Sequence, residues 1–289
     1  NERIGYNEGD ASLKYMASTL KYIFGERYVT RVSSDTFRAV GDATGLNFKI
    51  KELHDKVRCY SKFRSLEVKA GIYVQHEPDE PIEVCFTKAR VAEMTIKGIY
   101  DEYVAIYVDE MGARERLKTH LITHIDEAIQ NDYIKVYYQP VVDAKTNKLS
   151  GFEALARWID PKHGFISPLD FISVLEDAHL IHKLDLFMLK KVCEKYCEET
   201  RLGHKCVPVS FNLSRLDFKL SDIYKEVNRI TESYNVPHEM IHVEITESVL
   251  DGDDDGYIIN KIKNFQGQNI QVWMDDFGSG YSSLNVLKD

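Results

Sequence analysis

The sequence predicts an α/β protein of two domains: a small α/β domain over residues 1–112 and a parallel β/α barrel over residues 113–289. Three observations support this prediction. The 289 residues are enough for about two domains of ordinary size. Helical and strand patterns alternate along the second part, which is typical of a parallel β/α barrel. Hydrophobic residues make up 44% and charged residues 29%, so a buried core is expected and disorder is excluded.

The first domain is expected to be a small α/β sandwich. Ser33-Ser34-Asp35 separates two short strand patterns, which predicts a hairpin. The hydrophobic periodicity predicts helices over 11–24, 48–63 and 83–96, and strands over 28–32, 36–40, 66–75 and 103–108.

The second domain opens with a helix over 114–131 and two strands over 135–142 and 149–158. The connection between these strands is only six residues long. A parallel crossover needs about a dozen residues or more, so the two strands should be antiparallel. Helices are then expected over 168–178, 182–200, 221–234 and 256–266, alternating with strands over 207–213, 240–246 and 270–275. These are five strands, so we expect the barrel to continue past Asp289.

Polar side chains recur at or near the ends of four predicted strands. Glu153, Asn212, Glu244 and Asp275 are separated by 59, 32 and 31 residues. One βα repeat takes about 30 residues, so these positions should meet at the carboxyl face where β/α barrels carry their sites. Carboxylate and amide oxygens suit a hard divalent cation such as Mg²⁺ or Mn²⁺.

The pair Asp275-Asp276 precedes a glycine-rich FGSG segment, so each carboxylate can face a different ion. Two ions held about 3.5–4 Å apart clamp a phosphodiester and activate water. Arg157 shares a strand face with Glu153 and is suited to a phosphate oxygen. A single strand-end acid is usually solvated or caps a helix. The set together favours a site.

These residues carry a close resemblance to the EAL family, bacterial phosphodiesterases that open cyclic di-GMP (c-di-GMP) to linear pGpG. The resemblance runs from about residue 115 to the end and rests on five ordered motifs: YYQPVVD, GFEALARW, FNLS, VEITES and MDDFGSGYSSL. It implies a TIM-like barrel with an antiparallel first strand, c-di-GMP as substrate, and a two-metal site that holds Mg²⁺ or Mn²⁺.

The resemblance also implies roles for individual residues. Glu153, Asp276 and Glu247 would be catalytic, with Glu247 steadying the DDFGSG loop, and Gln139 and Arg157 would contact the dinucleotide. The first metal would be held by Glu153, Asn212, Glu244 and Asp275, and the second by Asp276. The family places a water-activating lysine about twenty residues after the paired aspartates, beyond Asp289, so we expect residues 1–289 alone to be poorly soluble or inactive.

The first half resembles a degenerate GGDEF diguanylate cyclase lacking its first strand. NERIGYNEGDASL and RVSSDTFRAV fall in the order of that family's motifs, but Ser33, Ser34 and Thr36 replace two glycines and an acid. Loss of these residues predicts that no c-di-GMP is made. Asn1 and Asp10 match the family's guanine-reading positions, which makes GTP a candidate regulator. The alternative is a scaffold that forms a homodimer surface.

Two other functions stay open at this point. A receptor module would bind c-di-GMP or GTP without chemistry, but such receptors usually lose metal ligands, and the five ligand positions are intact here. An unrelated barrel hydrolase would explain the acids but not the EALAR and YQP motifs.

Composition restricts partners and location. The net charge of −9 disfavours binding to DNA or RNA. Charged residues interrupt every long apolar run, so no membrane span is expected in this segment, although an anchor upstream is compatible with it. Five cysteines are an odd number without CxxC spacing, which favours a reducing cytoplasm. The ten histidines are scattered, and we expect no imidazole metal site among them.

Overall fold

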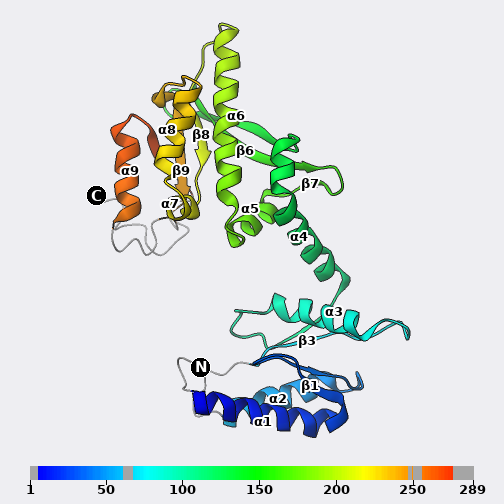
Figure 1. Cartoon of the computed structure of the whole chain (residues 1–289). Coiled ribbons are helices and arrows are strands. Elements are labelled where there is room, and N and C mark those ends of the chain that lie inside the picture. Colours follow the sequence, from blue (N-terminus) through cyan, green and yellow to red (C-terminus); the bar gives the residue numbers. More distant parts are fainter. Residues whose placement is uncertain (1–5, 61–67, 247–248, 250–255, 276–289) are drawn as a thin grey trace. The chain divides into compact units, whose positions relative to one another are not determined.

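The computed structural model describes residues 6–60, 68–246, 249 and 256–275 (Figure 1). Two compact units are present, Asn1–Leu117 and Lys118–Asp289. Their boundary falls inside one helix, α4 (Asp109–Gln130).

The first unit contains two small sheets among its described residues. β1 and β2 form the antiparallel hairpin that the sequence predicts, and β3 and β4 pair in parallel. The elements are α1 (Tyr6–Phe24), the 3-10 turn η1 (Glu26–Tyr28), β1 (Val29–Arg31), β2 (Phe37–Ala39), α2 (Leu46–Tyr60), β3 (Ala70–Ile72), α3 (Ile82–Thr95) and β4 (Val104–Ile106). The single sandwich expected from the sequence is therefore not what these residues show. Each strand has only three residues, and Thr30 and Arg31 of β1 are exposed. The hairpin therefore has little apolar surface with which to join β3 and β4 in one sheet.

Two separate cores hold this unit together. Leu20, Leu53 and Val57 join α1 to α2, and Phe37 of the hairpin packs against them. The second core lies between α3 and β4 and contains Ala92, Ile96 and Ala105. Gly71 of β3 lies directly beneath α3, where any side chain would collide with the backbone of the helix.

The second unit is built on a six-stranded mixed sheet. Its strands are β5 (Ile134–Val142), β6 (Leu149–Asp160), β7 (Gly164–Ile166), β8 (Val209–Asn212), β9 (Ile241–Thr246) and β10 (Gln271–Asp275). Its other helical elements are α5 (Pro168–Asp177), α6 (Ile181–Arg201), α7 (Arg215–Leu220), α8 (Ile223–Ser233), the 3-10 turn η2 (His238–Met240) and α9 (Tyr257–Gly267).

The strand directions confirm the main topological predictions. β5 and β6 are antiparallel, as their short connection requires, and β6, β8, β9 and β10 are parallel neighbours. β7, which the sequence analysis missed, pairs antiparallel with the end of β6. Within the described residues the sheet is open, with β10 and β5 at its edges, so closure into a barrel stays a prediction.

The core of the second unit lies between this sheet and its helices. Trp158, Phe171, Phe211, Phe218 and Phe265 are its largest fully buried side chains. α6 contacts α8, and α8 contacts α9, so the three helices stand side by side (Figure 1). Among the described residues of the whole chain, no helix combines the length and apolar character that a membrane crossing needs.

Candidate active site

Four neighbouring strands bring the predicted metal ligands to one part of the sheet. Glu153 lies on β6, Asn212 ends β8, Glu244 lies on β9 and Asp275 ends β10. The register pairs Asn212 with Glu244 directly, and it pairs Glu153 with Ser210, two residues before Asn212. Residues separated by 59, 32 and 31 positions in the sequence therefore come from four adjacent strands.

The side chains interact with one another. The Nδ2 of Asn212 donates to Oε1 of Glu153 at 3.3 Å. Glu244 is only 7% exposed. Burial is the largest cause that raises the pKa of its carboxyl, and the nearby negative charges of Glu153 and Asp275 raise it further, while a hydrogen bond from Ser210 opposes them. Three carboxylates thus share one electrostatic environment.

The end of β8 is fixed by a helix cap. Asn212 is followed by Leu213 and then Ser214, the N-cap residue of α7. The Ser214 hydroxyl accepts from the backbone N–H of Leu216 at 3.4 Å and donates to Oε1 of Glu176 at 2.7 Å. Asp217 completes a capping box by accepting from the Ser214 N–H at 2.7 Å. This local geometry holds the backbone that presents Asn212.

A glycine allows β6 to lie close to the backbone of the residue just before β8. Gly151 is buried two residues before Glu153, and a Cβ there would lie 2.7 Å from the carbonyl oxygen of Pro208. That carbonyl accepts the N–H of Phe152 at 3.0 Å. Only glycine permits this contact without a shift of one strand, so Gly151 helps to set the height of Glu153 relative to Asn212.

The two predicted substrate contacts lie beside this group. Gln139 is exposed on β5 and pairs with Glu153 across the antiparallel ladder. Arg157 follows Glu153 by four residues on β6, so both point to the same face. Its guanidinium carbon lies 5.8 Å from the Tyr137 ring centre, and its Nη1 donates to the carbonyl of Ala156 at 2.8 Å. The structure thus places Gln139 on the strand next to Glu153 and Arg157 on the same strand as Glu153.

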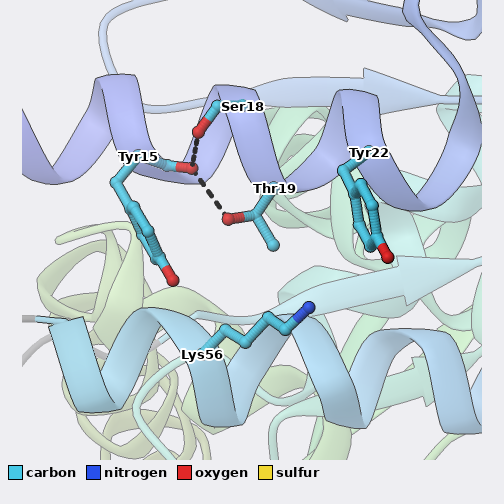
Figure 2. Close-up of a pocket in the computed structure, with 5 residues that line it drawn as sticks. All are labelled: Tyr15, Ser18, Thr19, Tyr22 and Lys56. Atoms are coloured by element: carbon cyan, nitrogen blue, oxygen red, sulfur yellow. Dashed lines mark hydrogen bonds between the residues drawn. The ribbon is translucent and has the colours of Figure 1, made fainter.

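Of the four other predicted positions, the structure describes one. Asn1, Glu247 and Asp276 lie outside the described residues. Asp10 is exposed on α1. The first unit has a hollow of about 250 Å³ between α1 and α2, but Asp10 is not among the residues that line it, which are Tyr15, Ser18, Thr19, Tyr22 and Lys56 (Figure 2).

The hollow offers little to a charged ligand. Its one cationic side chain, Lys56, pairs with Glu52 at 2.6 Å, and its Nζ lies 4.9 Å from the Tyr22 ring centre. The hydroxyls of Ser18 and Thr19 both donate to the carbonyl of Tyr15, at 2.8 and 2.9 Å (Figure 2). These groups are already engaged within the unit.

Glu153, Asn212, Glu244 and Asp275, on β6, β8, β9 and β10, are called the acidic group below, and they suit a hard divalent cation. Their donors are carboxylate and amide oxygens, which Mg²⁺ and Mn²⁺ prefer. Burial and then the negative charges of Glu153 and Asp275 raise the pKa of Glu244, and a cation near these carboxylates would lower it. The residues present therefore fit such an ion.

A family comparison decides the identity of this unit. The model of the EAL domain matches residues 123–289, more than half of the chain. The chain belongs to the EAL family. The match begins within α4, eight residues after the start of the resemblance expected from the sequence.

Known relatives of this EAL chain include phosphodiesterases. The chain is 27% identical over 295 residues to the cyclic di-GMP phosphodiesterase PdeR of Escherichia coli, covering 99% of this chain and 44% of PdeR. The chain spans between about a third and a half of the length of the curated relatives it matches over most of its own length.

Solved structures give the same picture of the fold. The phosphodiesterase PaMucR, solved as a c-di-GMP complex, matches with a TM-score of 0.53 and 28% identity over 58% of this chain and 68% of that chain. Vibrio cholerae LapD, solved as an S helix-GGDEF-EAL chain bound to c-di-GMP, matches with a TM-score of 0.52 over 99% of this chain and 69% of that chain. Its identity is 16%, so this likeness concerns the fold alone.

Sequence reasoning missed one further group of ligand-type side chains. His120, Asp160 and His163 place their donor atoms within 4.8 Å of one another. The sequence analysis expected no imidazole metal site, and it overlooked that His120 and His124 lie one helical turn apart on α4. That spacing does not point to this group, because His124 is not one of its members and His120 lies 40 residues before Asp160.

Proposed function

We propose that this chain hydrolyses c-di-GMP to linear pGpG with the help of Mg²⁺ or Mn²⁺ bound at the acidic group. The observation that carries the proposal is the placement of Glu153, Asn212, Glu244 and Asp275 on four adjacent strands, in the order of the family's motifs. Membership of the EAL family and the relatives PdeR and PaMucR support c-di-GMP as the substrate.

The residues of the chain have distinct tasks in this proposal. Glu153, Asn212, Glu244 and Asp275 hold the first ion, and Asp276 holds the second. A bound pair of such ions supplies charge neutralisation at the phosphodiester and a water of lowered pKa.

The remaining site residues position the substrate and the acidic segment. Arg157 and Gln139 bind and orient the dinucleotide from β6 and β5. A guanidinium that now lies over Tyr137 can turn to a phosphate oxygen, because no ion pair with another described residue holds it. Glu247 keeps the segment that carries Asp275 and Asp276 in place.

For the first unit we propose a degenerate GGDEF-like domain that makes no c-di-GMP and acts as a regulatory or scaffold part, with a homodimer surface. The sequence Ser33-Ser34-Asp35-Thr36 supports this, since it lacks two glycines and an acid of the motif. The Arg31 guanidinium donates to the carbonyls of Ser33 and Ser34, so it closes the turn on itself. Regulation by GTP through Asn1 and Asp10 is the finer form of this proposal.

The decisive experiment compares the release of pGpG from c-di-GMP by wild type and by Glu153→Gln in the presence of Mg²⁺. Loss of a metal ligand should lower kcat by several orders of magnitude, about 10³-fold or more. The exposed Glu232→Gln is the matched control and should retain wild-type turnover. If Glu153→Gln stays within about tenfold of wild type, the site assignment is wrong.

The same assays separate an enzyme from a receptor. Binding of c-di-GMP without release of pGpG, in the presence of Mg²⁺ or Mn²⁺, would favour a non-catalytic receptor. Replacement of Mg²⁺ by Ca²⁺ should keep binding but suppress turnover, because the larger ion tolerates a looser oxygen geometry. Incubation with GTP should give no c-di-GMP, and any synthesis would contradict the proposal for the first unit.

A further inference from the structure

A helix and a hairpin of the second unit bring together two imidazoles and a carboxylate. Asp160 ends β6, His163 lies in the turn that leads into β7, and His120 lies on α4. The three donor atoms all lie within 4.8 Å of one another. None of these residues takes part in the acidic group: Asp160 follows Glu153 by seven residues on β6, which is about 23 Å along an extended strand.

The carboxylate of Asp160 is held in a defined orientation. Its Oδ1 accepts the backbone N–H groups of Lys162 and His163 at 2.8 and 2.9 Å. Its Oδ2 lies 2.8 Å from Nε2 of His120. The Asp160 side chain is only 4% exposed, whereas His163 is exposed at the surface of the turn. One side of the group is therefore fixed and buried, and the other is open to solvent.

The two histidines lie close to one another as well. The ring centres of His120 and His163 are 4.6 Å apart and tilted by 58°. The His124 ring stacks on the His120 ring, with the ring centres 4.1 Å apart. The Nδ1 of His124 lies 2.9 Å from the carbonyl of His120 and 2.8 Å from the hydroxyl of Thr123. His124 thus packs against His120, and its Nδ1 is engaged by the Thr123 hydroxyl and the His120 carbonyl.

A simple ion pair needs only His120 and Asp160. It does not account for a third ligand-type side chain in the same few ångströms. Two imidazole nitrogens and one carboxylate oxygen form the donor set of transition-metal sites of the zinc type, with a further position for water. This set differs from the all-oxygen group on β6, β8, β9 and β10, which suits Mg²⁺.

We propose that His120, Asp160 and His163 form a binding site for a divalent transition metal such as Zn²⁺, separate from the acidic group. The backbone bonds to Asp160 Oδ1 orient the ligand, as outer contacts do in established metal sites. In the metal-bound form His120 would bind through Nε2 with its ring proton on Nδ1, and Asp160 would bind through Oδ2, in place of the hydrogen bond between these two atoms.

The site has a structural consequence within the second unit. His120 is the third residue of this unit, on the helix α4 that begins in the first unit. A bound metal ties this helix to the β6–β7 hairpin, and β6 also carries Glu153 and Arg157. Metal occupancy at the hairpin thereby restrains the strand on which the acidic group is built.

The test is calorimetric titration of the tag-free chain with zinc chloride, in excess Mg²⁺ to occupy the acidic group. We expect one Zn²⁺ per chain. His163→Ala should weaken binding by about 100-fold or more, since loss of a ligand exceeds the effect of an outer contact. This variant keeps the His120–Asp160 hydrogen bond, so its fold should be unchanged by circular dichroism.

Two further measurements make the outcome unambiguous. The exposed His204→Ala, a histidine paired with Glu199 outside the group, should bind Zn²⁺ as wild type does. Co²⁺ should give the visible absorption bands of a site with nitrogen ligands in wild type and lose them in His163→Ala. Absence of Zn²⁺ uptake in excess Mg²⁺, or equal affinity of wild type and His163→Ala, would overturn the proposal. Neither result depends on turnover of c-di-GMP.

Discussion

A buried pair of carboxyl groups beneath the α7 cap allows a sharp prediction about pH. Asp185 of α6 is 7% exposed and Asp217 of α7 is fully buried. Burial is the main cause that raises the pKa of each group, and the Asp217 charge and a hydrogen bond with its carboxyl raise the pKa of Asp185 well above its ordinary value. Glu176 adds to this repulsion, whereas His182 lowers the pKa of Asp217. Burial and the neighbouring carboxyl groups thus favour the protonated form of Asp185 in the folded protein.

The magnitude follows from linkage. Between the unfolded pKa of Asp185, 3.8, and its raised folded pKa, the folded state binds one more proton than the unfolded state. Each pH unit in this window lowers the free energy of unfolding by about 1.4 kcal/mol. In the variant Asp185→Asn the side-chain amide does not titrate, so this slope disappears. Within this window, the free energy of unfolding of the variant should therefore rise relative to that of wild type by on the order of 1 kcal/mol for each unit of pH.

The assay is urea unfolding of wild type and Asp185→Asn, followed by circular dichroism, at closely spaced pH values from about 4 to 7, starting just above the ordinary pKa of the carboxyl group. The exposed Asp177→Asn is the matched control, since its side chain is 71% accessible and should leave the wild-type slope in place. Parallel curves of unfolding free energy against pH for wild type and Asp185→Asn would show that the pair is not protonated, and would refute the reasoning.

Three further predictions concern packing around the site. Trp158→Ala removes the largest fully buried side chain, which packs against Phe171 at 5.8 Å between ring centres, and should lower the free energy of unfolding by about 3–5 kcal/mol in urea titrations. Ser214→Ala removes the N-cap of α7 and the hydrogen bond to Glu176, so the free energy of unfolding should fall by about 1–2 kcal/mol in thermal unfolding. The variant should also have a lower kcat with a smaller change in KM. Unchanged kinetics would contradict a role of this cap in placing Asn212. Gly151→Val forces β6 away from Pro208 and should reduce metal affinity and turnover together, whereas wild-type Mg²⁺ binding would show that the strand spacing is not critical.

The N-terminal half shows where sequence reasoning reached its limit. The hairpin of β1 and β2 was predicted because Ser33-Ser34-Asp35 separates two short β-patterns. The division of four strands into two sheets was not predicted, because pairing depends on which helix each strand packs against. Gly71 beneath α3 is part of that choice, and no local pattern reveals it.

For the acidic group, the sequence by itself determined which residues meet. Repeats of about 30 residues and a six-residue connection follow from chain geometry, so the parallel order of β8, β9 and β10 and the antiparallel β5 could be predicted. Only the tertiary structure decided how Glu244 is buried near Glu153 and Asp275, that Asp185 and Asp217 are buried next to one another, and that His163 reaches His120. Each of these contacts joins residues distant in sequence, and burial and distance between such residues are set by packing rather than by periodicity.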